Sequence, residues 1–155
     1  VGKRGFGQYG VRFGFGKDKG ENKKLETDYL EEFRNTPQFK VGMFYKMIWN
    51  GNNFRDQIFS FFGNSNLEKD FTLGLDEASD YIMYTRAYYW IQECNLQDKE
   101  WEEALIYYLD KELINCLKLS IKHYEEIEEF EKCAFLKKIQ TFLEKQELLK
   151  TLKEA

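Results

Sequence analysis

Residues 98–128 read DKEWEEALIYYLDKELINCLKLSIKHYEEIE, and the spacing of their apolar residues decides the fold class. Asp98 is a favourable helix N-cap, because its side chain can accept a hydrogen bond from a backbone N–H of the first turn. Apolar residues then recur every three or four positions, which is the period of one helix face. The residues on this face are Leu109, Leu113, Leu117, Ile121 and Tyr124. We expect one helix from Asp98 to about Glu128, the longest in the chain, unbroken between Leu109 and Tyr124.

A last helix is predicted after a short turn near Glu128 and Glu129, and it extends to about Leu152. Its apolar face consists of Phe135, Ile139, Phe142 and Leu143. Two long helices joined by so short a turn pack as an antiparallel hairpin. We expect Leu117 and Ile121 of the first helix to face the first two of these residues.

The residues before the hairpin predict further helices, and few segments alternate as strands do. One helix starts near Thr27 and breaks at Pro37, since proline disfavours a helical residue before it. Two more are expected over residues 38–50 and 53–62, separated at Asn50-Gly51. Residues 64–75 are expected to connect these helices to the next one, with Gly74 as a helix breaker.

A helix from Asp76 to about Cys94 carries two apolar stripes. One consists of Ala78, Ile82, Thr85 and Tyr89, and the other of Tyr81, Tyr84, Tyr88 and Ile91. A helix that is apolar on most sides is expected to lie between other elements. Together these segments predict an all-α, multi-helix bundle with a long C-terminal helical hairpin.

Residues 1–24 differ from the rest and predict an extended N-terminal arm, so we divide the chain into an arm (1–24) and a helical domain (25–155). Seven of these 24 residues are glycine, and each glycine costs a helix about 1 kcal/mol relative to alanine. Seven basic and two acidic residues give the arm a net charge of +5, so the whole-chain charge of −4 leaves −9 for the rest. A basic segment on an acidic body indicates a separate anionic partner or an acidic neighbour.

The arm also supplies the candidate binding residues. These are the basic and aromatic residues Lys3, Arg4, Phe6, Tyr9, Arg12, Phe13, Phe15 and Lys17. The aromatic side chains are suited to burial on a neighbouring protein subunit. Alternatively, the basic residues can neutralise phosphates while the aromatic rings stack on bases. The arm also matches GxGxxG at residues 5–10, but a phosphate-binding loop needs a preceding strand and a following helix, which we do not expect here.

Residues that carry chemistry are scarce. The chain has three cysteines without a CxxC spacing and a single histidine, His123, with no Glu-x-x-His pattern. We therefore expect no catalytic residue, metal site or cofactor, and reduced thiols in a cytoplasmic or other reducing intracellular compartment, or in a particle. No segment is apolar enough for a membrane span, and no signal peptide is apparent.

Residues 128–137 of the expected hairpin, EEFEKCAFLK, resemble the UVR motif, a small helical hairpin of excision-repair proteins and of adaptors in protein quality control. Phe130, Glu131, Ala134 and Leu136 match its pattern, while Lys137 stands where the motif has arginine. The resemblance covers residues 117–143 and implies protein–protein docking.

Taken together, the patterns predict a non-enzymatic structural or adaptor component of a larger macromolecular assembly. Other protein subunits would be its partners, bound through helical aromatic surfaces and the N-terminal arm. The alternative is a nucleic-acid-binding accessory protein that uses the basic, aromatic arm. An enzyme is the least favoured class, since it would need a deep pocket with convergent polar groups.

Overall fold

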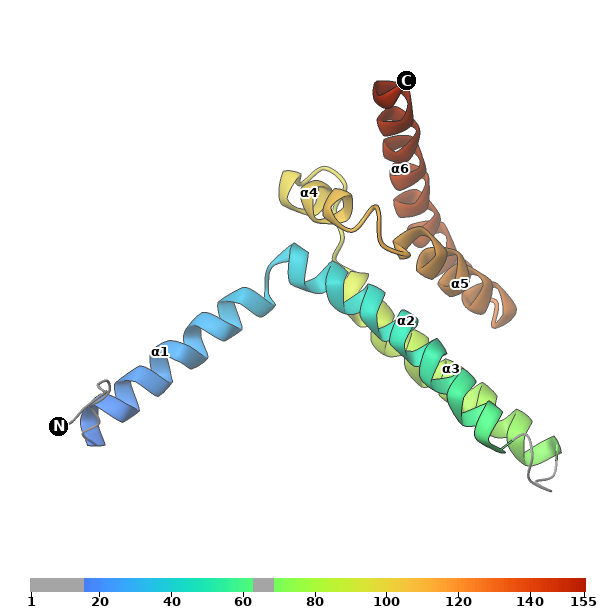
Figure 1. Cartoon of the computed structure of the whole chain (residues 1–155), viewed down its shortest axis with the longest axis horizontal. Coiled ribbons are helices and arrows are strands. Elements are labelled where there is room, and N and C mark those ends of the chain that lie inside the picture. Colours follow the sequence, from blue (N-terminus) through green and yellow to red (C-terminus); the bar gives the residue numbers. More distant parts are fainter. Residues whose placement is uncertain (1–15, 63–68) are drawn as a thin grey trace. The chain divides into compact units, whose positions relative to one another are not determined.

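The computed structural model describes residues 16–62 and 69–155, which form six α-helices and no strand (Figure 1). The all-α fold class is therefore confirmed. The chain divides into two units, Val1–Thr36 and Pro37–Ala155. The first contains α1 (Gly16–Arg34) and the second contains α2 to α6.

Helix α1 begins at Gly16, earlier than the start near Thr27 that the sequence indicated. Thr27 is not an N-cap, since its hydroxyl donates a 2.7 Å hydrogen bond to the backbone carbonyl of Lys23, one helical turn earlier. Residues 16–24 of the expected arm are thus helical. The good helix formers Glu21, Lys23 and Lys24 offset the glycines there. The remainder of the extended arm, residues 1–15, lies outside the described residues.

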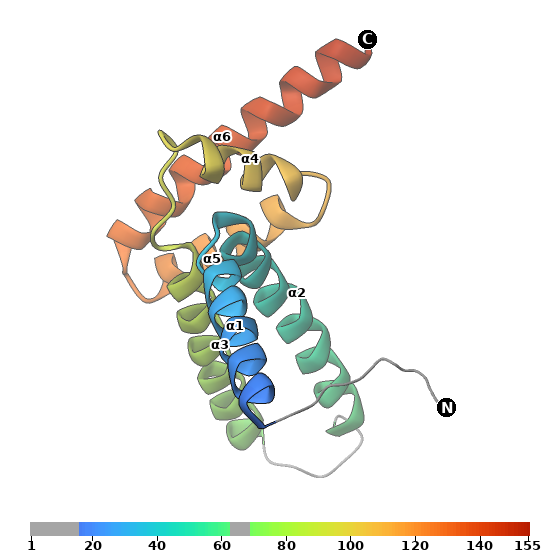
Figure 2. The same cartoon turned by 90° about the vertical axis from the view of Figure 1, so that its left-hand side faces the viewer.

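Helix α2 runs from Pro37 to Phe62 without the break expected at Asn50-Gly51. Pro37 stands at the first helical position, where its missing N–H is not needed. Gly51 does not end the helix but allows close packing. A Cβ at this position would clash with the side chain of Met83 on α3. The glycine lets α2 and α3 approach closely, and the two helices lie side by side (Figures 1 and 2).

Helix α3 extends from Lys69 to Ile91, so it begins before Asp76. Residues 69–75 were expected to connect helices and are instead helical, while residues 63–68 lie outside the described residues. Gly74 sits within α3 and is exposed. A single glycine costs about 1 kcal/mol, which the packing of α3 against α2 can offset.

The expected unbroken helix from Leu109 to Tyr124 is wrong. Helix α4 (Lys99–Tyr107) ends at a turn, and α5 (Leu113–Glu126) begins after it. Tightened hydrogen bonds close α4, from the N–H of Tyr108 to Leu105 and from the N–H of Leu109 to Ile106. No glycine or proline marks this bend.

Tertiary packing explains the bend. Both Leu109 and Leu113 are buried across it, and it allows α4 to pack on α2 while α5 packs on α6. Tyr108 at the bend lies against Gly42 of α2, where a Cβ would meet the tyrosine hydroxyl. The N-cap prediction itself holds, since the Asp98 carboxylate accepts a 3.0 Å hydrogen bond from the N–H of Glu100.

The C-terminal hairpin is formed by α5 and α6 (Phe130–Glu154), which pack along each other. The turn is tight: Glu128 adopts the left-handed conformation with φ of 62°. The N–H of Glu129 donates to the carbonyl of Tyr124 at 2.8 Å, and that of Glu128 to Glu125 at 3.1 Å. This is the Schellman arrangement, in which glycine usually takes the left-handed position.

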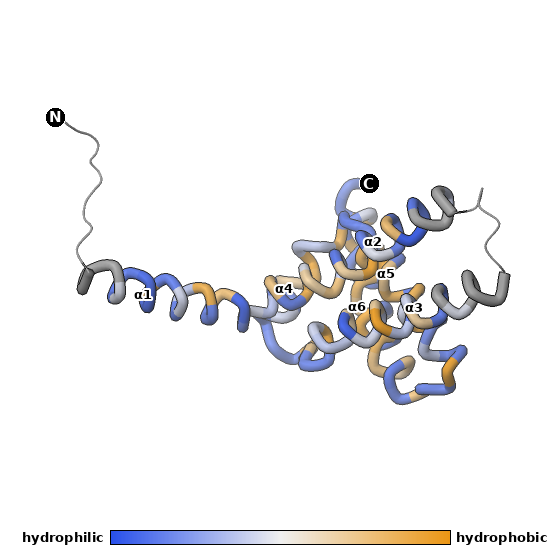
Figure 3. Tube along the Cα trace, turned by 90° about the horizontal axis from the view of Figure 1, so that it is seen from below, coloured by the Kyte–Doolittle hydropathy of each residue, from blue (hydrophilic) through white to orange (hydrophobic). Residues whose placement is uncertain are grey.

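The core lies where α2 to α6 of the second unit meet. It includes Leu117, Ile121 and Ile139, with Phe135 packed against it, so the residues expected to meet in the hairpin belong to one core. In Figure 3 much of the hydrophobic colouring of these helices lies where they meet. Among the helices that the structure describes, none is both long and apolar enough to cross a bilayer.

Candidate functional site

The predicted binding residues of the arm are not brought together by the described structure. Seven of them, from Lys3 to Phe15, lie outside the described residues. Lys17 falls in the first turn of α1, and its side chain is outside the described part. Their role therefore stays a prediction.

An exposed, mostly apolar and aromatic side of α3 is one candidate surface on the second unit, with the exposed Arg86 beside it. It consists of Ala78, Tyr81, Ile82, Thr85 and Tyr89, which we call the α3 outer face. Positions three or four apart lie on one side of a helix. Tyr81, Ile82 and Tyr89 are 60%, 55% and 63% exposed. The sequence had placed this stripe between other elements, and that expectation is wrong for the part that faces solvent.

The opposite side of α3 is anchored to the hairpin through aromatic contacts. Tyr84 is buried, and its backbone carbonyl accepts a 2.9 Å hydrogen bond from the hydroxyl of Tyr124. The ring of Tyr88 meets those of Tyr124 and Phe135 edge-on, with centroids 5.6 and 5.9 Å apart. These contacts fix the rotation of α3 about its own axis, and they thereby hold the α3 outer face toward solvent.

A polar cluster joins α2, α3 and α5 beside this aromatic contact. Arg55 of α2 pairs with Asp80 and lies 3.4 Å from Asp76, both on α3. Partial burial raises the pKa of the Asp80 carboxyl, against the opposing effect of Arg55. The His123 ring of α5 stacks on Tyr84, with centroids 4.5 Å apart.

Burial lowers the pKa of His123 more than the nearby carboxylate of Asp80 raises it. Its Nε2 is buried without a hydrogen-bond partner among the described residues. The arrangement supplies a neutral imidazole and a carboxylate, but no hydroxyl or thiol nucleophile is hydrogen-bonded to His123 within the described part. We read the cluster as the polar contact that sets the register of these three helices.

The thiols are poor nucleophiles where they lie. Burial raises the pKa of Cys94 and of Cys116 to about 12 in each case, so neither forms an appreciable thiolate at neutral pH. Cys133 is buried in the hairpin, where its Sγ donates a 3.6 Å hydrogen bond to the carbonyl of Ile121. Over residues 16–62 and 69–155, no three His, Cys, Asp or Glu side chains are grouped to hold a metal ion.

The residues that carry the UVR resemblance divide between the two sides of α6. Leu136 is buried against α5, whereas Phe130, Glu131 and Ala134 are exposed. Lys137 is exposed as well and lies 3.5 Å from Glu125 across the hairpin.

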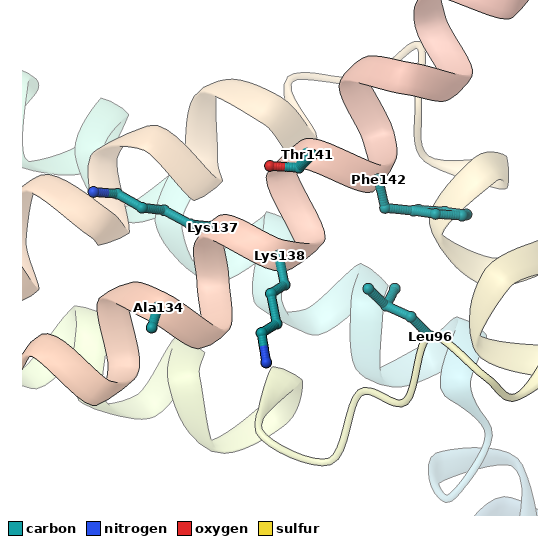
Figure 4. Close-up of a pocket in the computed structure, with 6 residues that line it drawn as sticks. All are labelled: Leu96, Ala134, Lys137, Lys138, Thr141 and Phe142. Carbon is teal, nitrogen blue, oxygen red and sulfur yellow. The ribbon is translucent and has the colours of Figure 1, made fainter.

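A shallow groove of about 450 Å³ opens along the exposed side of α6. It is lined by Leu96, Ala134, Lys137, Lys138, Thr141 and Phe142. Figure 4 shows Leu96, from the loop before α4, and Phe142, from α6, pointing into the same space. The sequence gives no sign of this groove, because Leu96 comes from a loop with no periodic pattern.

Comparison with known proteins gives no relative: no protein-family model, no curated protein and no solved structure matches this chain.

Proposed function

We propose that this chain is a non-enzymatic structural or adaptor component of a larger assembly, and that it binds a partner protein through the α3 outer face. Support comes from one observation. Three large side chains, Tyr81, Ile82 and Tyr89, are exposed along one side of α3, next to the exposed Arg86, while the other side of the same helix is firmly packed. Aromatic residues in such positions supply most of the energy at protein interfaces.

The test is recovery of the native complex with and without this face. We would isolate the tagged, full-length chain under mild conditions and determine the mass and composition of the complex. The variant Ile82→Glu with Tyr89→Glu should lose its protein partner while its helical circular dichroism stays unchanged. Ile106→Glu, the same change at an exposed isoleucine on α4, is the matched control. A native chain that is recovered alone would contradict the proposal, as would equal loss with Ile106→Glu.

A second candidate function is binding of nucleic acid by the N-terminal arm. The arm has a net charge of +5, whereas the rest of the chain is acidic, and a basic segment attracts phosphates. If the arm binds nucleic acid, affinity should fall steeply with salt as phosphate contacts release counterions. Replacing Arg4 and Arg12 with alanine should flatten that dependence. If the arm instead binds protein, changes at Phe13 and Phe15 should weaken binding most, and salt should have little effect.

A further inference from the structure

The outward side of α6 carries a regular repeat that the proposed function does not use. Its exposed residues follow spacings of four, three, four, three and four: Ala134, Lys138, Thr141, Lys145, Leu148 and Leu152. We call this set the α6 outer face. Positions with this alternation lie along one side of the helix, where a second helix can pack lengthwise; a coiled coil uses the same spacing, with mainly apolar residues, as its seam.

The length of the α6 outer face suits a helix. It spans the 19 residues from Ala134 to Leu152, or about 28 Å at a rise of 1.5 Å per residue. The last turns of α6 project past the other helices of the second unit in two views (Figures 1 and 2). Leu148 and Leu152 are accordingly 60% and 62% exposed. Nearer the start of α6, α5 covers the opposite side of the helix.

The charge of the α6 outer face specifies the partner. Two lysines, Lys138 and Lys145, stand on the seam itself, and it contains no acidic residue. Neither lysine forms an ion pair with another residue in the described part of the chain. A charged residue at such a position selects the partner, since it must meet an opposite charge when the seam closes.

The same two lysines disfavour a parallel pairing with a second copy of this helix. In a parallel pair of α6 helices, Lys138 would lie beside its own equivalent, and Lys145 likewise. Like charges brought together at an interface are repelled. The groove widens the surface on one flank, where Leu96 and Phe142 provide an apolar floor beside Lys138.

We propose that the α6 outer face binds an amphipathic helix of a different protein, with apolar residues at seam spacing and acidic residues opposite Lys138 and Lys145. The helix would lie along α6, with its apolar residues against Leu148 and Leu152. This surface is distinct from the α3 outer face, and the inference holds whether or not that face binds a partner.

The test uses the full-length chain and two synthetic helical peptides, each about 21 residues long, or three heptads. Both peptides carry leucine on the seam. One has glutamate, and the other lysine, at two seam positions one heptad apart. Fluorescence anisotropy should show binding of the glutamate peptide at least about tenfold tighter than that of the lysine peptide, the equivalent of about 1.4 kcal/mol.

The decisive variant is Lys138→Glu with Lys145→Glu, which should reverse the preference between the two peptides. Lys118→Glu with Lys122→Glu makes the same charge change at exposed positions on α5 and should leave the preference intact. Leu148→Ser with Leu152→Ser should weaken both peptides. Equal binding of the two peptides, or no binding of the glutamate peptide, would overturn the proposal. So would self-association that the lysine changes abolish, because the face would then belong to a second copy.

Discussion

The hydroxyl of Tyr124, near the end of α5, donates a hydrogen bond of 2.9 Å to the backbone carbonyl of Tyr84, in the middle of α3. Both residues are buried, so the bond joins the hairpin to the α2–α3 pair away from solvent. The Tyr84 ring also stacks on His123. One short stretch of α3 thus receives a hydrogen bond and a ring contact from neighbouring residues of α5.

Changing Tyr124 to phenylalanine removes the hydrogen bond and keeps the ring. We expect the free energy of unfolding to fall by about 0.5–1.5 kcal/mol, the usual net contribution of such a bond. Urea titration followed by circular dichroism would measure it. Tyr107→Phe, at an exposed tyrosine, should change stability little. An equal loss in both variants would show that the Tyr124–Tyr84 bond has no special role.

Leu117 tests the hairpin core. It is fully buried between α5 and α6, so Leu117→Ala should lower the free energy of unfolding by about 2–5 kcal/mol through lost burial and the cavity left behind. The neighbouring, exposed Leu119 provides the comparison, and Leu119→Ala should stay within about 0.5 kcal/mol of the native chain. A small effect at Leu117 would mean that this helix face is not packed as described.

Glu128 offers a stabilising substitution. Its φ of 62° places it in the left-handed region, which costs a residue with a Cβ about 1–2 kcal/mol. Glycine adopts that region freely, although it loses more chain entropy on folding. We therefore expect Glu128→Gly to raise the free energy of unfolding by up to about 1 kcal/mol. Lys122→Gly, within regular helix, should instead lower it by about the same amount. If both changes lowered the free energy of unfolding, Glu128 would not have the left-handed conformation described for this turn.

His123 should make stability depend on pH. Burial lowers its pKa in the folded chain, against Asp80 and Glu126, which raise it, while Lys132 lowers it further. In the unfolded chain the imidazole titrates near pH 6.5. As the pH falls below that value, the unfolded chain takes up a proton before the folded chain does, so stability decreases until the folded imidazole is protonated too.

Urea unfolding at about pH 7.5 and about pH 5.5 would reveal this decrease in stability, because the two pH values lie on either side of the usual histidine pKa. His123→Gln should reduce the difference between the two conditions. Asp80 acts in the opposite sense at lower pH: its raised pKa favours the folded chain below the pKa of the unfolded carboxyl, and this contribution is lost as the pH rises through the folded pKa. An unchanged pH difference in the His123→Gln variant would exclude His123 as the cause.

Local signals in the sequence were sufficient for the hairpin, because Leu117, Ile121 and Ile139 repeat at helical spacing and a short acidic turn separates the helices. Local signals were insufficient where packing against residues distant in the sequence determines whether a helix continues or ends. Gly51 resembles a helix terminator, yet it accommodates Met83 of another helix. The bend after Tyr107 has no breaker, since buried leucines on both sides of it and the neighbouring helices determine its position.

The candidate surfaces show the same limit. An apolar stripe such as that of Ile82 and Tyr89 is identical in sequence whether it faces a core or a partner, and only the fold separates the two cases. The α6 groove required Leu96 from a distant loop, which no period could reveal. By contrast, the seam of Lys138 and Lys145 was present in the sequence, but its significance depends on which side of α6 covers the core.

The burial of Val41, Phe44 and Ile48 on α2 has a consequence for synthesis of the chain. Helix α2 packs against α3, α4 and α5. Its apolar side is therefore covered only after these later helices have left the ribosome. Until α5 emerges, a nascent chain holds α2 and α3 with part of their apolar surface uncovered, a state prone to aggregation and to capture by chaperones. Ribosome-bound chains that stop before residue 113 should therefore engage chaperones more strongly than chains that include the hairpin.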